Sequence, residues 1–447
     1  MKTNVLAREV TPGFHTNEGA PAVRQSAEKE LTRAVSACML FEDTFYESGV
    51  NLAGRIAELC KSVSIPFLCD LAKRARTDLK LRHAPLWLCI QLLAKKGTPA
   101  ERNMVGDTIA ETIQRADELA EIIALYWKDG KKPLPRQLKA GVAKAFRKFD
   151  AYQLAKYNRD AKVKLRDALF LSHAKPKDEE QAALWRKLVA NELPSPDTWE
   201  VSLSKGADKK ETFTRLIAEK RLGYMALLRN LRNTIQADVD RQTVERALLE
   251  GAAKSKALPF RFVSAARHAS AYAQTLSDAM LTAVAGHPKL LGTTHLVIDV
   301  SGSMDCALSG KSELLRYEAG AALAVLMREI CEHCRVFTFS QSLVEVMSLR
   351  GLALMQGIAQ SQPHGGTYLA GSLRQLAAQC PRADRVIVIT DEQSHDGITT
   401  PHADRAYLVN VGVYAPALPS MGGGWHRISG FSERLIDWIM AEESVTS

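Results

Sequence analysis

Two segments of this chain place oxygen-bearing side chains where a metal ion could be held. Residues 295–304, HLVIDVSGSM, are an apolar run of strand length that stops at Asp299 and is followed by hydroxyls at Ser301 and Ser303. Such a strand points its last carboxylate and the hydroxyls of its loop toward one place at the carboxyl edge of a sheet, where open α/β sheets bind ligands. A second apolar run, 386–390, ends at Asp391. Donors of oxygen alone suit a hard divalent cation, and we expect Mg²⁺.

A third segment supplies a further hydroxyl. Thr367 follows two glycines, where backbone can approach a ligand closely. A helical stretch from Ser312 to Cys334 and a strand at 335–339 separate it from the first loop, and this alternation predicts a parallel, doubly wound sheet. Alone, the first loop is equally typical of a helix N-cap or a turn. The complete series resembles the metal-ion-dependent adhesion site of von Willebrand factor A domains, in the order Asp299, Ser301, Ser303, Thr367, Asp391.

That resemblance implies a role for each donor. The two serines and the threonine would contact the cation directly, and the two aspartates would hold it through water or through further hydrogen bonds. One coordination position would stay open for an acidic group of a partner. The alternative is a purely structural pocket without metal.

Length and composition are those of an ordinary globular chain. With 447 residues, 46% of them hydrophobic and 24% charged, the chain has room for two to four domains. No apolar run approaches the ~18 residues of a membrane helix, and the first residues lack the apolar core of a signal peptide. The eight cysteines are scattered, several within apolar helical stretches, which is typical of buried thiols. We therefore expect a cytoplasmic protein without membrane contact.

Positive charge is concentrated in one segment. Residues 130–176 hold 13 Lys and Arg but only three Asp and Glu, a net charge of +10, whereas the whole chain carries +9. Residues 286–447 are acidic, with 12 basic against 16 acidic residues. Such localisation indicates a polyanionic partner, although a solvated helix surface is the ordinary alternative. We call residues 130–176 the basic band.

Three regions follow from the patterns along the chain. Residues 1–25 are polar and aperiodic, and we expect an N-terminal arm. Residues 26–285 show apolar residues at spacings of three and four, interrupted repeatedly by proline and glycine, which predicts an array of short helices. In the basic band, Lys144, Arg147 and Lys148 fall on one predicted helix face, and Lys162 and Arg166 on another. Residues 286–447 form the domain with strands.

Three helical segments carry a more specific pattern: 165–176 (LRDALFLSHAKP), 223–232 (GYMALLRNLR) and 258–262 (LPFRF). Followed by an A domain, they resemble the Ro autoantigen family, in its bacterial type, whose helical part is the TROVE module. The resemblance implies a mainly α protein, a ring of HEAT-like helical repeats closed by a doubly wound α/β von Willebrand factor A domain. One departure is Phe170, at a place where we expect a basic residue in animal members, so the outer RNA site could be remodelled.

The resemblance also implies a function. Family members bind small structured Y RNAs on an outer basic face and pass single-stranded 3′ ends of misfolded RNA through the central hole, in RNA quality control or processing. In bacteria they are linked to an exoribonuclease, polynucleotide phosphorylase. We therefore predict a non-enzymatic ribonucleoprotein component that binds a Y-like RNA and single-stranded RNA. The predicted RNA-binding residues are Lys139, Lys144, Arg147, Lys148, Lys162, Lys164, Arg166, His173, Lys175, Arg229, Arg232 and Arg261.

Other motifs are weaker. Cys331 and Cys334 with the histidine between them lack a second cysteine pair at zinc-site spacing, so we expect packing at a helix end. His395 and Asp396 have no nucleophile beside them, and we expect a loop role. The competing function is an adaptor that delivers substrates to a ring-shaped ATPase through its metal site. That function would leave the basic band without a role.

Overall fold

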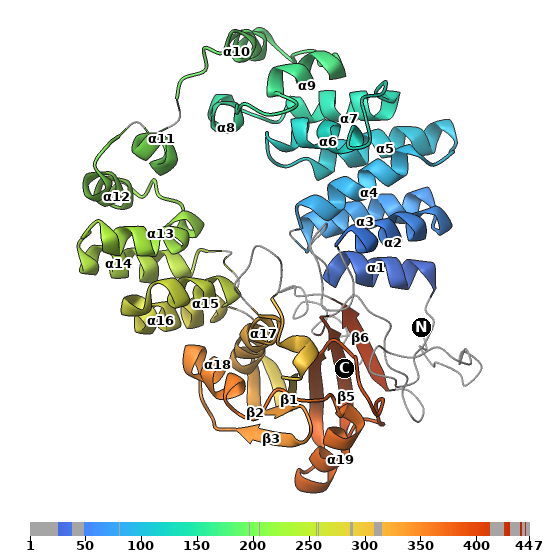
Figure 1. The fold of residues 1–447 in the computed structure, drawn as a ribbon, viewed down its shortest axis with the longest axis vertical. Helices are drawn as coiled ribbons and strands as arrows, with labels where there is room; N and C mark the ends of the chain where they lie inside the picture. Colours follow the sequence, from blue (N-terminus) through green and yellow to red (C-terminus); the bar gives the residue numbers. More distant parts are fainter. Residues whose placement is uncertain are drawn as a thin grey trace.

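The structure is a computed structural model that describes residues 26–37, 49–79, 81–195, 197–204, 206–255, 257, 259–286, 289–307, 315–411, 424–429, 439 and 443. The predicted N-terminal arm, residues 1–25, lies outside the described residues. Within them, the chain is helical up to Val284 and becomes a strand at Leu290. Figure 1 shows the helices as an arc that stands on the strand-containing domain.

Helices α1 to α10 form the first arm of the arc. Their starts follow local signals: at α5, Thr98 and Glu101 make a capping box, with Pro99 in the first turn. Asp150 and Gln153 do the same at α8. The bounds are α1 Ala27–Ala37, α2 Gly49–Ser62, α3 Ile65–Thr77, α4 His83–Leu93, α5 Pro99–Thr112, α6 Glu118–Tyr126, α7 Arg136–Phe146, α8 Ala151–Tyr157, α9 Leu165–Ser172 and α10 Glu179–Ala190.

Helices α11 to α16 form the second arm. Residues 191–198 connect the two arms. The bounds are α11 Trp199–Ser204, α12 Lys209–Ala218, α13 Tyr224–Gln236, α14 Arg241–Ala252, α15 Pro259–His268 and α16 Ala273–Val284.

The two arms have separate hydrophobic cores. The first core runs from Leu31 to Leu188 and is made of α1 to α10 alone. The second begins at Phe213 and continues without a break through α16 into one face of the sheet, where it includes Ile298 and Ile389. The second arm is thus fused to the strand-containing domain by shared apolar packing.

The C-terminal domain is built on a six-stranded sheet of order β3-β2-β1-β4-β5-β6. All neighbouring strands are parallel except the edge strand β3, which runs antiparallel to β2. The sheet is therefore mixed, whereas the sequence predicts a parallel sheet. The bounds are β1 Leu290–Asp299, α17 Arg316–Ile330, β2 Cys331–Phe339, β3 Leu343–Val346, α18 Gly351–Ala359, α19 Leu369–Gln379, β4 Ala383–Thr390, β5 Ala403–Asn410 and β6 Trp425–Ser429.

One predicted boundary in this domain is wrong. The helix predicted to reach Cys334 ends at Ile330, and the strand begins at Cys331, which pairs with Leu290 of β1. Cys331 already has extended dihedral angles (φ −78°, ψ 139°), so pairing with β1 stops the helix one turn earlier than its apolar pattern suggests. Cys331 and Cys334 are therefore free thiols at the start of a strand.

Helices cover both faces of the sheet. Along β1, Leu296 and Ile298 face the core shared with α17, whereas Val297 faces a separate core that includes Leu369 and Leu373 of α19. This alternation is the two-residue period of a strand buried on both sides. The domain is therefore doubly wound, as predicted.

Both ends of the arc reach the C-terminal domain and close a ring. At one end α1 packs beside β6, and at the other α15 and α16 pack on α17 and α18 (Figure 1). Arg267 of α15 also donates a hydrogen bond to the carboxylate of Glu318 in α17. None of the described helices is long and apolar enough to cross a membrane.

Candidate metal centre and nucleic-acid interface

The five predicted metal donors lie at the carboxyl edge of the sheet. Asp299 ends β1 and Asp391 directly follows β4, and these two strands are neighbours. Ser301 and Ser303 belong to the loop after β1, and Thr367 precedes α19. All five side chains are buried: Asp299, Ser301 and Asp391 are 0% exposed, Thr367 is 3% exposed and Ser303 is 5% exposed.

Hydrogen bonds hold the first loop in shape. The backbone N–H of Ser301 donates to Asp299 Oδ1 at 2.9 Å, and the two serine Oγ atoms lie 3.4 Å apart. The other carboxylate oxygen of Asp299 accepts from the hydroxyl of Thr390. The sequence analysis missed Thr390, although its place directly before Asp391 at a strand end could have indicated it.

Asp391 keeps one oxygen without a hydrogen-bond partner. Its Oδ1 accepts from the backbone N–H of Gln393 at 3.1 Å, but its Oδ2 is buried and has no partner in hydrogen-bonding geometry. An unsatisfied buried carboxylate oxygen is costly. A water molecule bound to a cation would satisfy this oxygen, so the residues present fit a divalent metal.

The pKa shifts of Asp299 and Asp391 also favour a bound cation. Burial, together with the negative charge of Asp391, raises the pKa of Asp299 to about 7, although hydrogen bonds from Ser301 and Thr390 oppose the rise. Burial also raises the pKa of Asp391, while the amide of Gln393 and the nearby Ser303 hydroxyl lower it. Two buried carboxylates side by side are therefore hard to ionise together unless positive charge lies between them.

The loop that carries Thr367 is anchored from both sides. Gly302 N–H donates to the carbonyl of Gly365 at 2.9 Å, which ties it to the first loop. The backbone N–H of His395 donates to the carbonyl of Thr367 at 2.8 Å. A Cβ at Gly366 would lie 3.1 Å from the ring of Tyr368, so a larger residue here would need that ring to move slightly.

Asp396 fixes the start of the next helix. Its carboxylate accepts from the backbone N–H groups of Ala370 at 3.0 Å and Gly371 at 2.6 Å, and from the hydroxyl of Ser394 at 2.9 Å. It thereby holds the first turn of α19, directly after the Thr367 loop. The loop role expected for Asp396 is thus a capping role beside the metal donors.

Glu392 links the candidate metal site to the far edge of the sheet. It has a left-handed backbone (φ 58°) and a fully buried carboxylate. That carboxylate accepts from Asn410 Nδ2 at 2.7 Å and from Arg427 Nε at 3.1 Å, so it joins the ends of β4 and β5 to the middle of β6. In the described part of the chain, no group of three or more His, Cys, Asp or Glu side chains could hold a metal, so this site depends on its hydroxyls as well as its two carboxylates.

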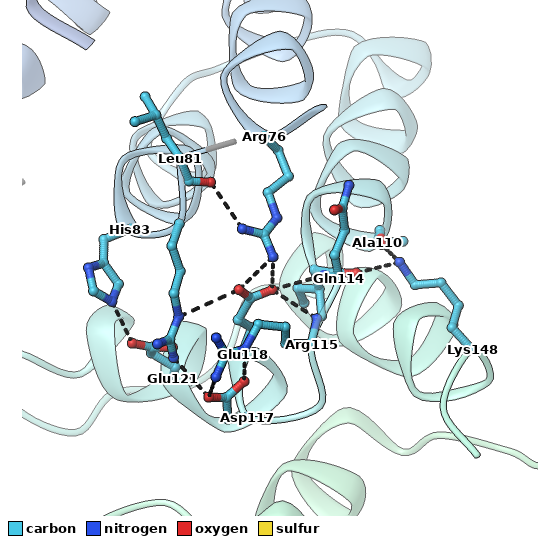
Figure 2. Close-up of polar contacts among 12 residues, drawn as sticks. Arg76, Leu81, His83, Ala110, Gln114, Arg115, Asp117, Glu118, Glu121 and Lys148 are labelled. Atoms are coloured by element: carbon cyan, nitrogen blue, oxygen red, sulfur yellow. Dashed lines mark hydrogen bonds and ion pairs between the residues drawn. The ribbon is translucent and has the colours of Figure 1, made fainter. Parts of the chain in front are cut away.

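In the basic band, five predicted RNA-binding residues already have protein partners, among them Arg166, which lies 3.9 Å from the carboxylate of Asp167. Lys144 pairs with Asp107 of α5 at 2.8 Å, although both side chains are exposed. Arg147 Nε donates to the carbonyl of Lys175 at 2.9 Å. Lys148 differs most: its ammonium donates to the carbonyls of Ala110 and Ile113 at the end of α5, as Figure 2 shows for Ala110.

The predicted shared face of Lys144, Arg147 and Lys148 needs correction. Helix α7 ends at Phe146, so Arg147 and Lys148 follow the helix instead of extending its face. The ammonium of Lys148 turns inward, burial lowers its pKa, and it stabilises the C-terminus of α5 rather than pointing to a partner. Lys162 also lies outside a helix, because α9 begins only at Leu165.

The remaining predicted residues of the band lie on or near the surface. Lys139 is half-buried on α7, and Lys162 and Lys175 are exposed. Lys164 pairs with the exposed Asp160 at 2.6 Å. On α9 and its C-cap, the exposed side chains are Arg166, Phe170 (60% exposed) and His173, the last with a left-handed backbone (φ 54°).

Cations of the band lie over aromatic rings. Lys132 Nζ is 4.4 Å from the centre of the Tyr126 ring, and Lys131 Nζ is 5.6 Å from that of Trp127. Lys156 Nζ lies 5.9 Å from the centre of the Tyr157 ring. These contacts place cations and aromatic rings together without adding negative charge.

The structure brings the three other predicted arginines into one cavity. Arg229 and Arg232 of α13 and Arg261 of α15 line a cavity of about 380 Å³, together with Ser264 and His268. The sequence analysis missed the serine and the histidine, which lie one and two turns after Arg261 on α15. We call this cavity the arginine pocket.

Unlike the arginines of the arginine pocket, the buried Arg76 of the first arm has a carboxylate partner. Arg76 donates to both carboxylate oxygens of Glu118 at 2.7 and 2.9 Å, and the backbone N–H groups of Gln114 and Arg115 donate to one of them (Figure 2). Both charges are compensated, so the network stabilises the turn before α6 and does not require a ligand.

Comparisons with known proteins agree with this architecture. A TROVE domain family model matches residues 190–289, and a Ro60 vWA domain model matches residues 294–414. The crystal structure of the Ro (RSR) protein of Deinococcus radiodurans is similar in fold, with a TM-score of 0.58 and 20% sequence identity over 91% of this chain and 97% of that chain. Among curated proteins, none matches this sequence. This chain thus contains a region similar to a TROVE domain, followed by one similar to a Ro60-type von Willebrand factor A domain, in a fold similar to that of a bacterial Ro protein.

Proposed function

We propose that this chain is an RNA-binding protein of the Ro type. It binds a small structured, Y-like RNA and the single-stranded 3′ ends of misfolded RNA, and it acts in RNA quality control or processing without an enzymatic step of its own. The observation that carries the proposal is positive charge that the described protein leaves without carboxylate partners, gathered in the basic band and the arginine pocket.

Structured RNA is the partner of the basic band. Ten of its 13 cations have no carboxylate within 4 Å among the described residues, and two of these ten, Arg147 and Lys148, bond to backbone carbonyls instead. Phosphate contacts from such residues position an RNA regardless of sequence, and the exposed Arg166 of α9 and His173 at its C-cap add contacts that select structured RNA. The other eight cations are Lys131, Lys132, Arg136, Lys139, Lys156, Arg159, Lys162 and Lys175.

Single-stranded 3′ ends are the partner of the arginine pocket. Arg229, Arg232 and Arg261 lie on the second arm of a closed ring, next to the helices that pack on the C-terminal domain. Guanidinium groups bind phosphate through paired hydrogen bonds. A free strand end can reach such a pocket, whereas a blunt helix end is too wide for it.

The metal centre serves a protein partner. Ser301, Ser303 and Thr367 would contact a divalent cation, Mg²⁺ in our proposal, and Asp299 and Asp391 would hold it indirectly. When bound, the cation supplies positive charge that an acidic group of a partner can ligate. An exoribonuclease such as polynucleotide phosphorylase is the partner class that fits RNA processing, and the cytoplasm is the compartment that fits these partners.

Filter binding at increasing salt tests the proposal. Replacing Lys131, Lys132 and Lys139 together with glutamine should lower the slope of log affinity against log salt by about two to three, since each phosphate contact contributes about 0.9. An RNA with a single-stranded 3′ tail should bind better than a blunt hairpin of equal length.

The matched control removes three exposed cations outside the band, Lys209, Arg246 and Lys254, and should leave the salt slope unchanged. If the band variant keeps the parent slope and both RNAs bind equally, the RNA function fails. An adaptor for a ring-shaped ATPase would then be the better reading of the metal centre.

A further inference from the structure

Positive charge dominates the lining of the arginine pocket. Arg229, Arg232 and Arg261 line it, and none of them has a carboxylate within 4 Å in the part of the chain that the structure describes. Neither α13 nor α15 contains an aspartate or a glutamate. Burial and the charge of Arg229 both lower the pKa of Arg261, the direction expected when like charges are held together.

The rest of the lining is partly apolar. Met225, Leu228 and Leu231 of α13 and Ala265 of α15 also line the cavity, as does the polar Asn233. A cavity of about 380 Å³ lies within the range of sites that bind small molecules. An apolar wall beside a cationic one suits a ligand with a flat organic part and a strongly charged end, rather than an inorganic ion alone.

We propose that the arginine pocket binds the terminal phosphomonoester of a nucleotide, with the phosphate on Arg229, Arg232 and Arg261 and the nucleoside against the apolar wall. This inference rests on the proposed RNA function and makes it specific. It assigns to the pocket a particular chemical end of the RNA strand rather than any stretch of its backbone.

The number of arginines favours a monoester over a diester. An internal phosphodiester carries one negative charge, whereas a terminal phosphate carries about −1.5 to −2 near pH 7 and offers three strong acceptor oxygens. Three guanidinium groups supply enough positive charge to neutralise such a phosphate and one group for each of its three oxygens. Ser264 and His268, also in the lining, add further polar groups beside the arginines.

Four single-stranded RNAs of one sequence test the proposal: with a 3′-phosphate, with a 5′-phosphate, with both, and with hydroxyls at both ends. Affinity measured by fluorescence anisotropy should be about tenfold to a hundredfold higher for at least one phosphorylated end than for the hydroxyl ends. A gain with the 3′-phosphate or with the 5′-phosphate identifies which end of the RNA strand the pocket binds. A free nucleoside monophosphate is the third source of such a phosphate, and its binding is measured by calorimetry.

Matched variants connect the effect to the pocket. In Arg229→Gln/Arg261→Gln the gain from the terminal phosphate should disappear, while binding of the hydroxyl-ended RNA to the basic band is retained. In the control Arg246→Gln/Lys254→Gln, which removes the same charge from exposed positions outside the pocket, the gain should remain. Circular dichroism and melting curves confirm that both variants are folded.

The outcomes separate this inference from the proposed function. Equal affinity for all four RNAs overturns the inference and leaves RNA binding intact. The same conclusion follows if the terminal phosphate still raises the affinity of the Arg229→Gln/Arg261→Gln variant. If the protein binds none of the RNAs but binds the nucleoside monophosphate through the pocket, the inference stands and the RNA function fails. Binding of neither RNA nor nucleotide overturns both.

Discussion

Replacing Asp299 with asparagine should stabilise the metal-free protein near pH 8 and abolish its stabilisation by Mg²⁺. Asparagine has the shape of aspartate and keeps an oxygen that can accept from the N–H of Ser301, a bond of 2.9 Å in the structure. The hydroxyl of Thr390, which donates to the other carboxylate oxygen, can accept from the new amide. The substitution thus removes one charge with little change in packing.

The magnitude follows from the cost of ionising the buried carboxyl. Burial and the charge of Asp391 raise its pKa from 3.8 to about 7. At about 1.4 kcal/mol for each tenfold change in acidity, ionisation in the folded protein costs up to about 4 kcal/mol. Local relaxation reduces this cost, so we expect a gain of about 2 to 4 kcal/mol, or roughly 4 to 10 °C in the melting temperature of the C-terminal domain.

The pH dependence has a definite sign. Because the pKa of Asp299 in the folded protein lies above its ordinary value, the folded state binds more protons than the unfolded chain between about pH 4 and 7. This contribution to stability is fully present below that window, falls as the pH rises through it, and is lost above about pH 7. Mg²⁺ requires ionised carboxylates, so its stabilising effect should grow across the same window.

Differential scanning calorimetry at pH 5 and pH 8, with a chelator or with millimolar Mg²⁺, makes the comparison. Asp305→Asn is the matched control, because this exposed carboxylate lies in the same loop but is not one of the five donors. It should respond to Mg²⁺ like the parent. If Asp299→Asn without metal melts at or below the parent at pH 8, or keeps the parent's response to Mg²⁺, the reasoning about the buried pair is refuted.

Three other substitutions test the packing around the sites. Lys148→Met should lower the free energy of unfolding by about 1 to 2 kcal/mol in urea titrations, because carbonyls at the end of α5 lose their donor. Lys144→Met should change it by under about 0.5 kcal/mol, because its ion pair is exposed. Equal effects of the two substitutions would contradict the inward position of Lys148. Glu118→Gln should cost about 3 kcal/mol, because Arg76 stays buried without a counter-charge, and a loss below about 1 kcal/mol would argue against that burial. Asp396→Ala should weaken Mg²⁺ binding several-fold in calorimetry, because the first turn of α19 loses its acceptor. An unchanged affinity for Mg²⁺ would show that Asp396 does not position the metal donors.

The sheet and the grouping of the metal donors could be predicted because they depend on local patterns. Asp299 and Asp391 each end an apolar run, and parallel strands bring their carboxyl ends to one edge of the sheet. The antiparallel direction of β3 and the early start of β2 at Cys331 could not be read in this way. Both depend on which strand lies alongside, and that is a property of the folded sheet.

For a similar reason, the sequence could not show which lysine and arginine side chains are available to contact a partner. Lys144 and Lys148 look alike in the sequence, yet the partner of the first is a carboxylate and the partners of the second are backbone carbonyls, all supplied by the distant helix α5. Conversely, Arg229 and Arg261 are 32 positions apart and carry no shared motif, and only the packing of α13 on α15 makes them neighbours.

Uncompensated charge distinguishes the candidate sites from the rest of the ring. Arg76 and Glu118 are buried, but they compensate each other, and their role is architectural. The pair Asp299 and Asp391 and the arginine pocket are opposite cases. The two buried carboxylates lie together, and the charge of Arg316 offsets only part of the cost of ionising them; the three arginines have no carboxylate within 4 Å among the described residues. Folding tolerates such groups at a cost that a bound ligand of opposite sign removes. A cation for the carboxylates and an anion for the arginines are therefore expected to stabilise this protein independently, and additive shifts in melting temperature on adding Mg²⁺ and a nucleoside monophosphate would follow. A nucleotide that stabilises the Arg229→Gln/Arg261→Gln variant as much as the parent would show that the charge of the pocket is not its recognition element.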